Sequence, residues 1–257
     1  MHGRSMIHSD AYAEALYRAW ATRKPLSSPF LPDECSEDDA YRIQEALVAR
    51  LPGRVSGFKL GFTTPAMRHQ FGVEHPNYGR LFDWMAIEGE MVPLDRFIHP
   101  RVEPEIAVRL SHALAAQCDP ATVERAVAAV YPVLEVVDSR FVDYRFRPFE
   151  NTADNSSAAG YRLGPAHDPT VLPLLSDITV RLTRNGQAID EGTLAVLGQE
   201  PLALVCWLVA QLARRGAALP ADAIVLTGGL TRAHPAHRGD WFRADFGPLG
   251  AVELTFA

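Results

Sequence analysis

The sequence predicts an α+β protein in which an N-terminal helical part packs on a mixed, barrel-like β core. Apolar residues recur at helical spacing in the first fifty residues, whereas short alternating segments and turn residues dominate after residue 53. The helices expected after that point are too few and too irregularly placed for a doubly wound sheet or a TIM barrel. We therefore divide the chain into a helical region, residues 1–52, and a β core, residues 53–257.

Composition and charge exclude several classes of protein. Of the 257 residues, 47% are hydrophobic and 22% are charged, as in ordinary globular proteins. No run of about 18 apolar residues lacks charges or prolines, so we expect no membrane segment. A net charge of −6 without a long basic run argues against nucleic acid as a partner. Three distant cysteines and an N-terminus without an apolar signal core lead us to expect a cytoplasmic protein.

Two helices are expected in the helical region. Tyr12, Leu16 and Trp20 recur at helical spacing, and a connector with three prolines follows at residues 24–32. Ser36 followed by Asp39 resembles a capping box, in which each residue's side chain binds the other's backbone amide. The sequence therefore predicts that a second helix begins after Ser36 and continues through Val48.

The β core is expected to begin with a short apolar strand at residues 57–62. Residues 101–110 are a second expected strand, and Pro104 has no amide hydrogen for a neighbour, so this strand lies at an edge or is interrupted there. Asp119 and Pro120 predict the start of a helix, and residues 131–138 return to a strand. The buried face of that helix is assigned to Val123, Ala126, Val127 and Val130.

The sequence of the C-terminal third predicts two hairpins, with a helix between them along the chain. Alternation at residues 178–182 leads to Asn185-Gly186, a type I′ turn signal. Residues 201–213 are a mostly apolar helix with Gly216 at its C-terminal cap. A short buried strand at residues 224–226 follows, and residues 242–256 form the second hairpin.

Three glutamates suggest a metal site. Glu103 and Glu105 are two residues apart in an expected strand, so both carboxylates point to one side among apolar neighbours. Burying two like charges is unfavourable unless a cation lies between them. Glu135, isolated in another apolar strand, completes an all-oxygen set that suits Mg²⁺ or Mn²⁺. The alternative is that these glutamates face solvent or pair with nearby arginines.

Lys59 is the other candidate for chemistry. It lies between Phe58 and Leu60 and is bounded by two glycines. If its amine enters a pocket, desolvation is expected to lower its pKa and make it a proton carrier. The alternative is a surface lysine whose stem covers apolar neighbours.

Six stretches, taken in order, carry a resemblance that spans nearly the whole chain. The chain resembles the 2-keto-4-pentenoate hydratase and 4-oxalocrotonate decarboxylase group of the fumarylacetoacetate hydrolase superfamily. The stretches are GFKLGFTTPAMRHQFGVEHPNYGRLFDWM (57–85), RVEPEIAVRL (101–110), YPVLEVVDSRF (131–141), NTADNSSAAGYRLG (151–164), VLGQEPLALVCWLVAQLARRGAAL (196–219) and the C-terminal segment from IVLTGGL onward.

The resemblance implies the fold and the roles of several residues. The fold would be a β-roll core of the fumarylacetoacetate hydrolase C-terminal type. Glu103, Glu105 and Glu135 would bind the divalent metal, and Lys59 would be the active-site acid/base. It also implies a homo-oligomer, able to pair with a sister decarboxylase or hydratase, that acts on a small 2-oxo acid in meta-cleavage breakdown of aromatic compounds. Candidate substrate-binding residues are Asn77, Tyr78, Leu81, Thr227 and Gly228.

Asn77 bears on which reaction is implied. Hydratases of this group commonly have an aspartate at this position, and an asparagine cannot ionise or act as a general base. The resemblance implies hydration of a 2-hydroxypenta-2,4-dienoate-type substrate. A 4-oxalocrotonate-type decarboxylase is the alternative, and a catalytically inactive 2-oxo acid-binding protein is a further one.

Overall fold

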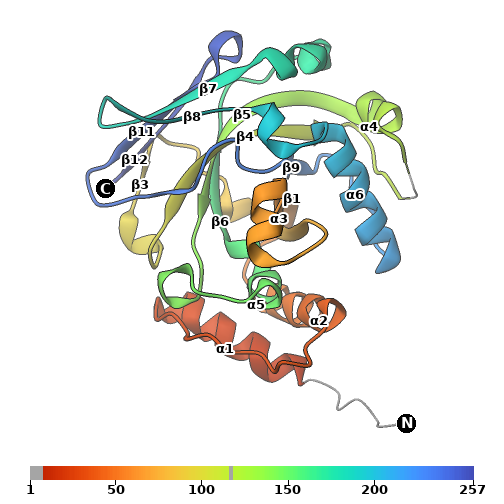
Figure 1. The fold of residues 1–257 in the computed structure, drawn as a ribbon, viewed down its shortest axis with the longest axis vertical. Helices are drawn as coiled ribbons and strands as arrows, with labels where there is room; N and C mark the ends of the chain where they lie inside the picture. The colour runs from red at the N-terminus through yellow and green to blue at the C-terminus, as the bar shows by residue number, and fades with distance from the viewer. Residues whose placement is uncertain (1–7, 116–117) are drawn as a thin grey trace.

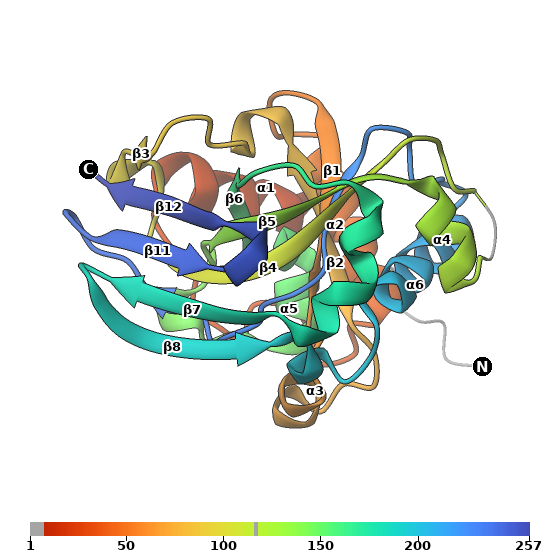
Figure 2. The ribbon, with the colours of Figure 1, turned by 90° about the horizontal axis from the view of Figure 1, so that it is seen from above.

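The computed structural model describes residues 8–115 and 118–257. Two β-sheets curl into a half-barrel, and the helices at the start of the chain lie together at one end of the molecule (Figure 1). The two sheets are stacked in the view of Figure 2, with β12, β11, β7 and β8 on one side. This architecture confirms the predicted α+β class.

The helical region contains α1, Ser9–Thr22, and α2, Glu37–Val48. The predicted capping box is confirmed, because the Ser36 hydroxyl accepts from the Asp39 amide and the Asp39 carboxylate accepts from the Ser36 amide. The buried faces of the two helices meet each other and the segment after β5, through Leu16, Ile43 and Phe141. The first strand begins at Val55, and the division of the chain at residue 52 remains a prediction.

The main sheet carries the three glutamates and Lys59. Its strands lie in the order β2-β1-β9-β4-β5-β6, with β10 also paired to β4, and only β1 and β9 run parallel. The bounds are β1 Val55–Gly61, β2 Asn77–Phe82, β4 Arg101–Leu110, β5 Val127–Val137, β6 Ala158–Leu163, β9 Ile224–Leu226 and β10 His234–Pro235.

Pro104 interrupts one side of β4, which is the second of the two alternatives predicted for this strand. β4 is inside the sheet, where its whole length pairs with β5. On its other side β10 pairs with Val102 and β9 pairs with Ala107, so Pro104 lies between the two. The Pro104 carbonyl accepts from the Leu230 amide at 2.9 Å. The missing amide hydrogen of proline therefore falls where no ladder requires one.

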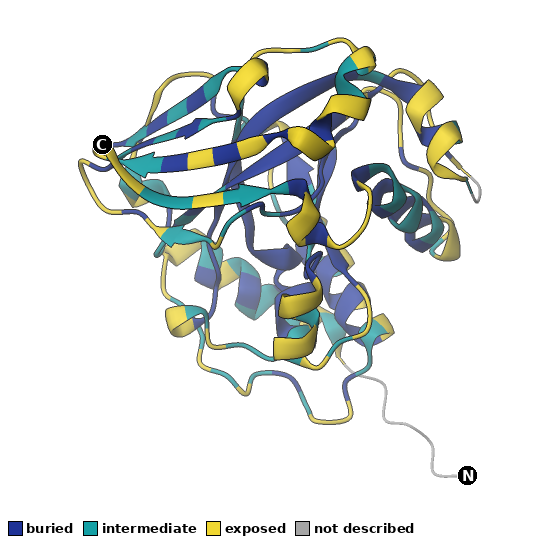
Figure 3. Cartoon of the chain, turned by 45° about the horizontal axis from the view of Figure 1, so that its top comes forward, coloured by how far each residue is buried: buried dark blue, intermediate teal, exposed yellow. Residues whose placement is uncertain are grey.

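The second sheet covers one face of the core. Its strands lie in the order β3-β12-β11-β7-β8, and their bounds are β3 Met91–Val92, β7 Thr179–Arg184, β8 Gln187–Thr193, β11 Trp241–Asp245 and β12 Ala251–Phe256. Asn185 and Gly186 both have positive φ, which confirms the type I′ hairpin. Buried positions alternate with more exposed ones along the strands of this sheet (Figure 3). The buried positions include Val180, Phe242 and Phe256, which belong to the main core.

Four more helices pack around the sheets: α3 Pro65–Phe71, α4 Pro120–Ala126, α5 Pro148–Ala153 and α6 Pro201–Arg214. The helix predicted at Asp119 and Pro120 ends earlier than expected. Val127 and Val130 belong to β5, where they pair with Leu110 and Val108 of β4. The expectation that they line the helix was wrong, because pairing with β4 overrides the short helical pattern of this apolar run.

The segment Leu194–Arg214 is long and apolar enough to cross a membrane when judged by length and composition alone. In the structure its helical part, α6, contacts α4 and buries Leu204, Leu208 and Leu212 in the main core. This packing is that of a core helix.

Candidate active site

A cavity of about 370 Å³ opens where β1, β4, α3 and two loops meet. One loop follows β9 and contributes Gly229, Thr231, Arg232 and Ala233, and the other joins β5 to β6. Lys59 and Glu103 line its polar end, and Phe62, Phe71 and Phe146 line another part. A cavity with an apolar wall and a few converging polar groups is the usual form of a small-molecule site.

The three predicted glutamates converge at the polar end. Glu103 of β4 stands directly opposite Glu135 of β5, and Glu105 points to the same face two residues further on. One carboxylate oxygen from each lies within 4.8 Å of the other two. Glu105 and Glu135 are fully buried, whereas Glu103 is partly exposed and lines the cavity.

Several of these carboxylate oxygens lack a hydrogen-bond partner. Among the described residues, none donates to Oε1 of Glu105 or to either oxygen of Glu135. Burial and the charge of Glu135 raise the pKa of Glu103 to about 7, and burial with the charges of Glu135 and Glu103 raises that of Glu105 well above its ordinary value. Buried, unpaired carboxylates are strongly unfavourable without a cation. This hard oxygen set fits a divalent ion.

Lys59 lies beside this cluster. Its side chain is buried, and its Nζ lies 3.2 Å from Oε2 of Glu135 as an ion pair that lacks hydrogen-bond geometry. Burial works to lower the pKa of Lys59, but the charges of Glu135, Glu103 and Glu105 raise it above its ordinary value. The expectation of a lowered pKa was therefore wrong for the chain alone, because three carboxylates outweigh desolvation.

The loop after β9 holds one of the glutamates. The Gly228 amide donates to Oε2 of Glu105 at 2.7 Å, and its φ of +110° suits glycine. A side chain on Gly229 would overlap Oε2 of Glu103, so this loop approaches the carboxylates only because it is glycine here. Thr227 donates to the Ile106 carbonyl at 2.9 Å. Gly228 and Thr227 thus position the cluster without lining the cavity themselves.

Three predicted substrate-binding residues do not line the cavity. Tyr78 is fully buried and stacks on Tyr41 with ring centroids 4.6 Å apart. Leu81 is fully buried in the second apolar cluster. Asn77 is buried and bonds to side chains that do line the cavity, but it does not line the cavity itself.

Sequence reasoning missed several residues that line the cavity. Arg101 and Tyr144 form part of one wall, with the Arg101 guanidinium 4.0 Å from the centre of the Tyr144 ring. Asn151, Ser156 and Ser157 form another wall. The sequence did contain a signal for Arg101, because it is two residues before Glu103 and both side chains therefore point to the same face of the strand. No local pattern places the β5–β6 connection against the cavity.

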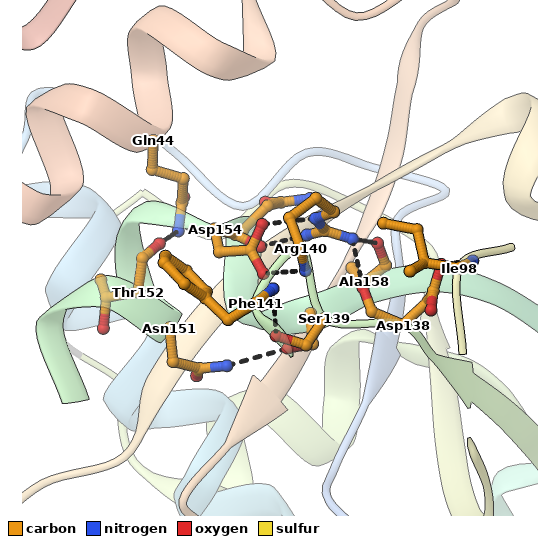
Figure 4. A network of polar contacts seen from close by, with 12 residues as sticks. Gln44, Ile98, Asp138, Ser139, Arg140, Phe141, Asn151, Thr152, Asp154 and Ala158 are labelled. Atoms are coloured by element: carbon orange, nitrogen blue, oxygen red, sulfur yellow. Dashed lines mark hydrogen bonds and ion pairs between the residues drawn. The ribbon is translucent and has the colours of Figure 1, made fainter. Parts of the chain in front are cut away.

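A buried ion pair anchors that connection (Figure 4). Arg140 pairs with Asp154 and donates to the carbonyls of Asp138 and Ala158, so the segment is tied at both ends. The Asp138 carboxylate accepts from the amides of Ile98 and His99, at 2.7 and 2.8 Å. Because both charges are buried, loss of either partner leaves an unpaired ion in the interior. This network fixes the wall that carries Asn151 to Ser157.

Comparison with known proteins agrees with the fold. The family model described as fumarylacetoacetate (FAA) hydrolase C-terminal matches residues 73–257. The chain belongs to this family, as the resemblance predicted.

The relatives within this family include both hydratases and decarboxylases. The chain is 34% identical over 252 residues to a 2-keto-4-pentenoate hydratase of Paraburkholderia xenovorans (strain LB400), covering 95% of this chain and 93% of that protein. It is also 34% identical over 228 residues to a 4-oxalocrotonate decarboxylase of Pseudomonas putida, covering 85% and 84%. The solved 4-oxalocrotonate decarboxylase from Pseudomonas putida G7, complexed with magnesium and adipate, has a TM-score of 0.92 at 30% identity and covers both chains fully.

Proposed function

We propose that this protein is a divalent-metal-dependent lyase that acts on small 2-oxo or 2-hydroxydienoate acids. The observation that carries the proposal is the convergence of three glutamates with unpartnered oxygens beside a buried lysine, at the end of a small cavity. Relatives of both hydratase and decarboxylase type, and a magnesium complex of a similar structure, support it.

Glu103, Glu105 and Glu135 would hold the ion, which we propose to be Mg²⁺ or Mn²⁺. When bound, such an ion supplies a Lewis acid that stabilises the enolate of a 2-oxo acid. Lys59 is close enough to the cluster to deliver a proton to, or accept one from, the substrate carbon chain. Its contact with Glu135 holds the Lys59 amine beside the cluster.

Hydration of a 2-hydroxypenta-2,4-dienoate-type acid is the first candidate reaction. Lys59 would protonate the far end of the dienolate, and water would then add to the conjugated ketone. Hydratase relatives that are 34% and 36% identical to this chain support this reading.

Decarboxylation of a 4-oxalocrotonate-type diacid is the second candidate, and Asn77 favours it. Of the described acidic residues, only Glu103 and Asp143 line the cavity, and Asp143 is exposed. An amide at position 77 cannot activate water as a carboxylate could. The same glutamates and Lys59 would serve this reaction, with CO₂ lost from the distal carboxylate.

An ultraviolet assay with and without Mg²⁺ tests both. It compares 2-hydroxypenta-2,4-dienoate with 4-oxalocrotonate and scores hydration against release of CO₂. We expect turnover that requires the metal and is abolished by Glu135→Gln, whereas Glu124→Gln, at an exposed position, keeps it. Full activity in chelator-treated buffer would contradict the proposal. Tight Mg²⁺ binding without turnover of either acid would identify an inactive binding protein.

We also propose a cytoplasmic protein, on the basis of its cysteines and N-terminal sequence, that forms a homo-oligomer, as the resemblance implies. Light scattering of the purified protein tests the assembly, and copurification tests pairing with a sister enzyme.

A further inference from the structure

A second cavity, of about 260 Å³, lies where the helical region meets the β core. The end of α1 contributes Trp20 and Arg23, the segment between β2 and β4 contributes Trp84 and Arg96, and the segment after β5 completes the wall. No residue lines both this cavity and the active-site cavity. Small-molecule sites often form at such junctions between parts of a fold, so this cavity is a candidate for a separate ligand.

Arg96 brings a positive charge into this cavity that no acidic side chain balances. Its guanidinium lies 5.4 Å from the centre of the Trp84 ring and 5.7 Å from that of Phe97. It donates one hydrogen bond, to the Trp84 carbonyl at 2.5 Å. Burial lowers the pKa of Arg96, and no carboxylate among the described residues forms an ion pair that would offset this. A partly buried guanidinium with unused N–H donors is a suitable partner for a carboxylate.

The two buried charges of the cavity already have partners. Arg140 forms its ion pair with Asp154. The two oxygens of the Asp138 carboxylate accept from the backbone amides of residues 98 and 99 (Figure 4). Arg23 is exposed and has no acidic partner among the described residues. The charges without a partner in this cavity are therefore both positive, which favours an anion as the ligand.

Two tryptophans indicate the kind of anion that fits. Trp20 and Trp84 line the cavity with their ring centres 5.6 Å apart and their planes inclined by 49°. Both side chains are half-buried, so their rings offer flat apolar surface next to Arg96. An aromatic ligand gains from ring contacts beyond the area that it buries. The volume of the cavity is just below the usual range for ligands, about 300–1,000 Å³, and therefore suits a single ring better than a nucleotide.

We propose that this cavity binds a small aromatic carboxylate, with its ring against Trp20 and Trp84 and its carboxylate on Arg96. An inorganic anion would use the charge of Arg96 but not the aromatic walls. A neutral aromatic compound would fill the walls but leave the guanidinium without a partner. The inference goes beyond the proposed function and does not depend on it, because the two cavities are lined by different residues.

A ligand in this cavity contacts both parts of the chain. Trp20 belongs to α1, whereas Asp138 and Arg140 follow β5 and anchor the β5–β6 connection. Since the cavity exists only while α1 is packed on the β core, a ligand that occupies it stabilises the folded protein by mass action. The melting temperature should therefore rise with the concentration of the ligand, and this rise should be lost in Arg96→Gln.

The test measures binding by calorimetry, with benzoate as the probe. Benzamide has the same ring without the charge, and cyclohexanecarboxylate has the same charge without the aromatic ring. We expect benzoate to bind about tenfold more tightly than benzamide, as for one hydrogen bond to a charged group. It should also bind several-fold more tightly than cyclohexanecarboxylate. Inorganic phosphate should not compete, and the affinity for benzoate should be the same with and without Mg²⁺, which separates this cavity from the glutamate cluster.

Three variants locate the bound benzoate. Arg96→Gln should weaken it about tenfold and remove the preference over benzamide, whereas Trp20→Leu should remove the preference over cyclohexanecarboxylate. Arg54→Gln takes the same charge from an exposed position and should leave the affinity unchanged. The inference is overturned if the parent protein binds no benzoate, if binding requires Mg²⁺, or if Arg96→Gln and Arg54→Gln have equal effects. None of these results bears on the proposed function, which is tested by turnover.

Discussion

At the scale of single residues, the site brings together three carboxyl groups and one amine that are buried or partly buried. Glu103, Glu105 and Glu135 repel one another, and the one ammonium of Lys59 offsets only part of that repulsion. The result is a strong preference for an added cation. Lys59 therefore has two effects, since it would carry the proton and it also competes with a metal for Glu135.

Replacement of Lys59 tests these two effects together. We expect Lys59→Met to lower turnover about 10²- to 10⁴-fold, the usual contribution of a general acid or base. Its affinity for Mg²⁺ should be unchanged or higher, because the ammonium no longer competes for Glu135. Ultraviolet assays and calorimetry measure the two quantities. Lys24→Met, at an exposed position, is the control, and parallel losses of turnover and metal affinity would show that Lys59 only supports the cluster.

At the scale of elements, two antiparallel strands and one glycine loop build the cluster. The β4–β5 register sets Glu103 opposite Glu135, and the loop after β9 caps Glu105 with the Gly228 amide. The loop can come this close only because Gly229 has no side chain against Glu103. The loop and the two strands together therefore determine where the three glutamate carboxylates lie.

Gly229→Ala tests the contribution of the loop. The new methyl group would overlap Oε2 of Glu103, whose carboxylate can swing away at little cost in stability but then leaves the cluster. We expect Mg²⁺ affinity to fall about tenfold, with a melting temperature of the metal-free protein within a few degrees of the parent. Gly89→Ala is the control, because its nearest heavy atoms would lie 3.9 Å away. Equal metal affinity in the two variants would contradict this view of the loop.

At the scale of the whole molecule, local patterns predicted the cluster but not the cavity around it. The period of two along a strand was enough to bring Glu103 and Glu105 to one face, and the apolar context marked Glu135 and Lys59. Ser157 and Asn151 could not be found this way, because their place depends on the Arg140–Asp154 pair and on left-handed backbone.

One alternative left open by the sequence and one wrong prediction also depended on partners distant in sequence. Whether Pro104 lies at an edge or at an interruption depends on β9 and β10, which follow it by more than a hundred residues. Val127 and Val130 fit a helix or a strand equally well by pattern, and only pairing with β4 decides between them. The pattern of apolar residues was therefore enough to locate helices and strands along the sequence. Where each one begins or ends was set by pairing with strands distant in sequence.

Gln44 connects the helical region to the β core, and its loss tests whether the two unfold together. This fully buried residue of α2 donates to the carbonyls of Tyr78 and Thr152, at 2.9 and 2.7 Å, and accepts from Arg80. Gln44→Leu keeps the volume but leaves two buried carbonyls unpartnered, at about 1–3 kcal/mol each. We expect urea unfolding to show a loss of about 2–5 kcal/mol, against less than about 0.5 kcal/mol for exposed Gln187→Leu.

The same unfolding curves test the division of the chain at residue 52. Trp20 of α1 contacts Trp84 of the core at 5.6 Å between ring centres, so tryptophan fluorescence reports on the contact between the two parts. Far-ultraviolet circular dichroism reports on the backbone of both. Gln44, Leu16 and Ile43 are all buried between the helical region and the β core. We therefore expect the two probes to give one coincident transition in both the parent and Gln44→Leu. A separate early loss of fluorescence would instead mean that residues 1–52 open on their own while the β core, with its glutamate cluster, stays folded.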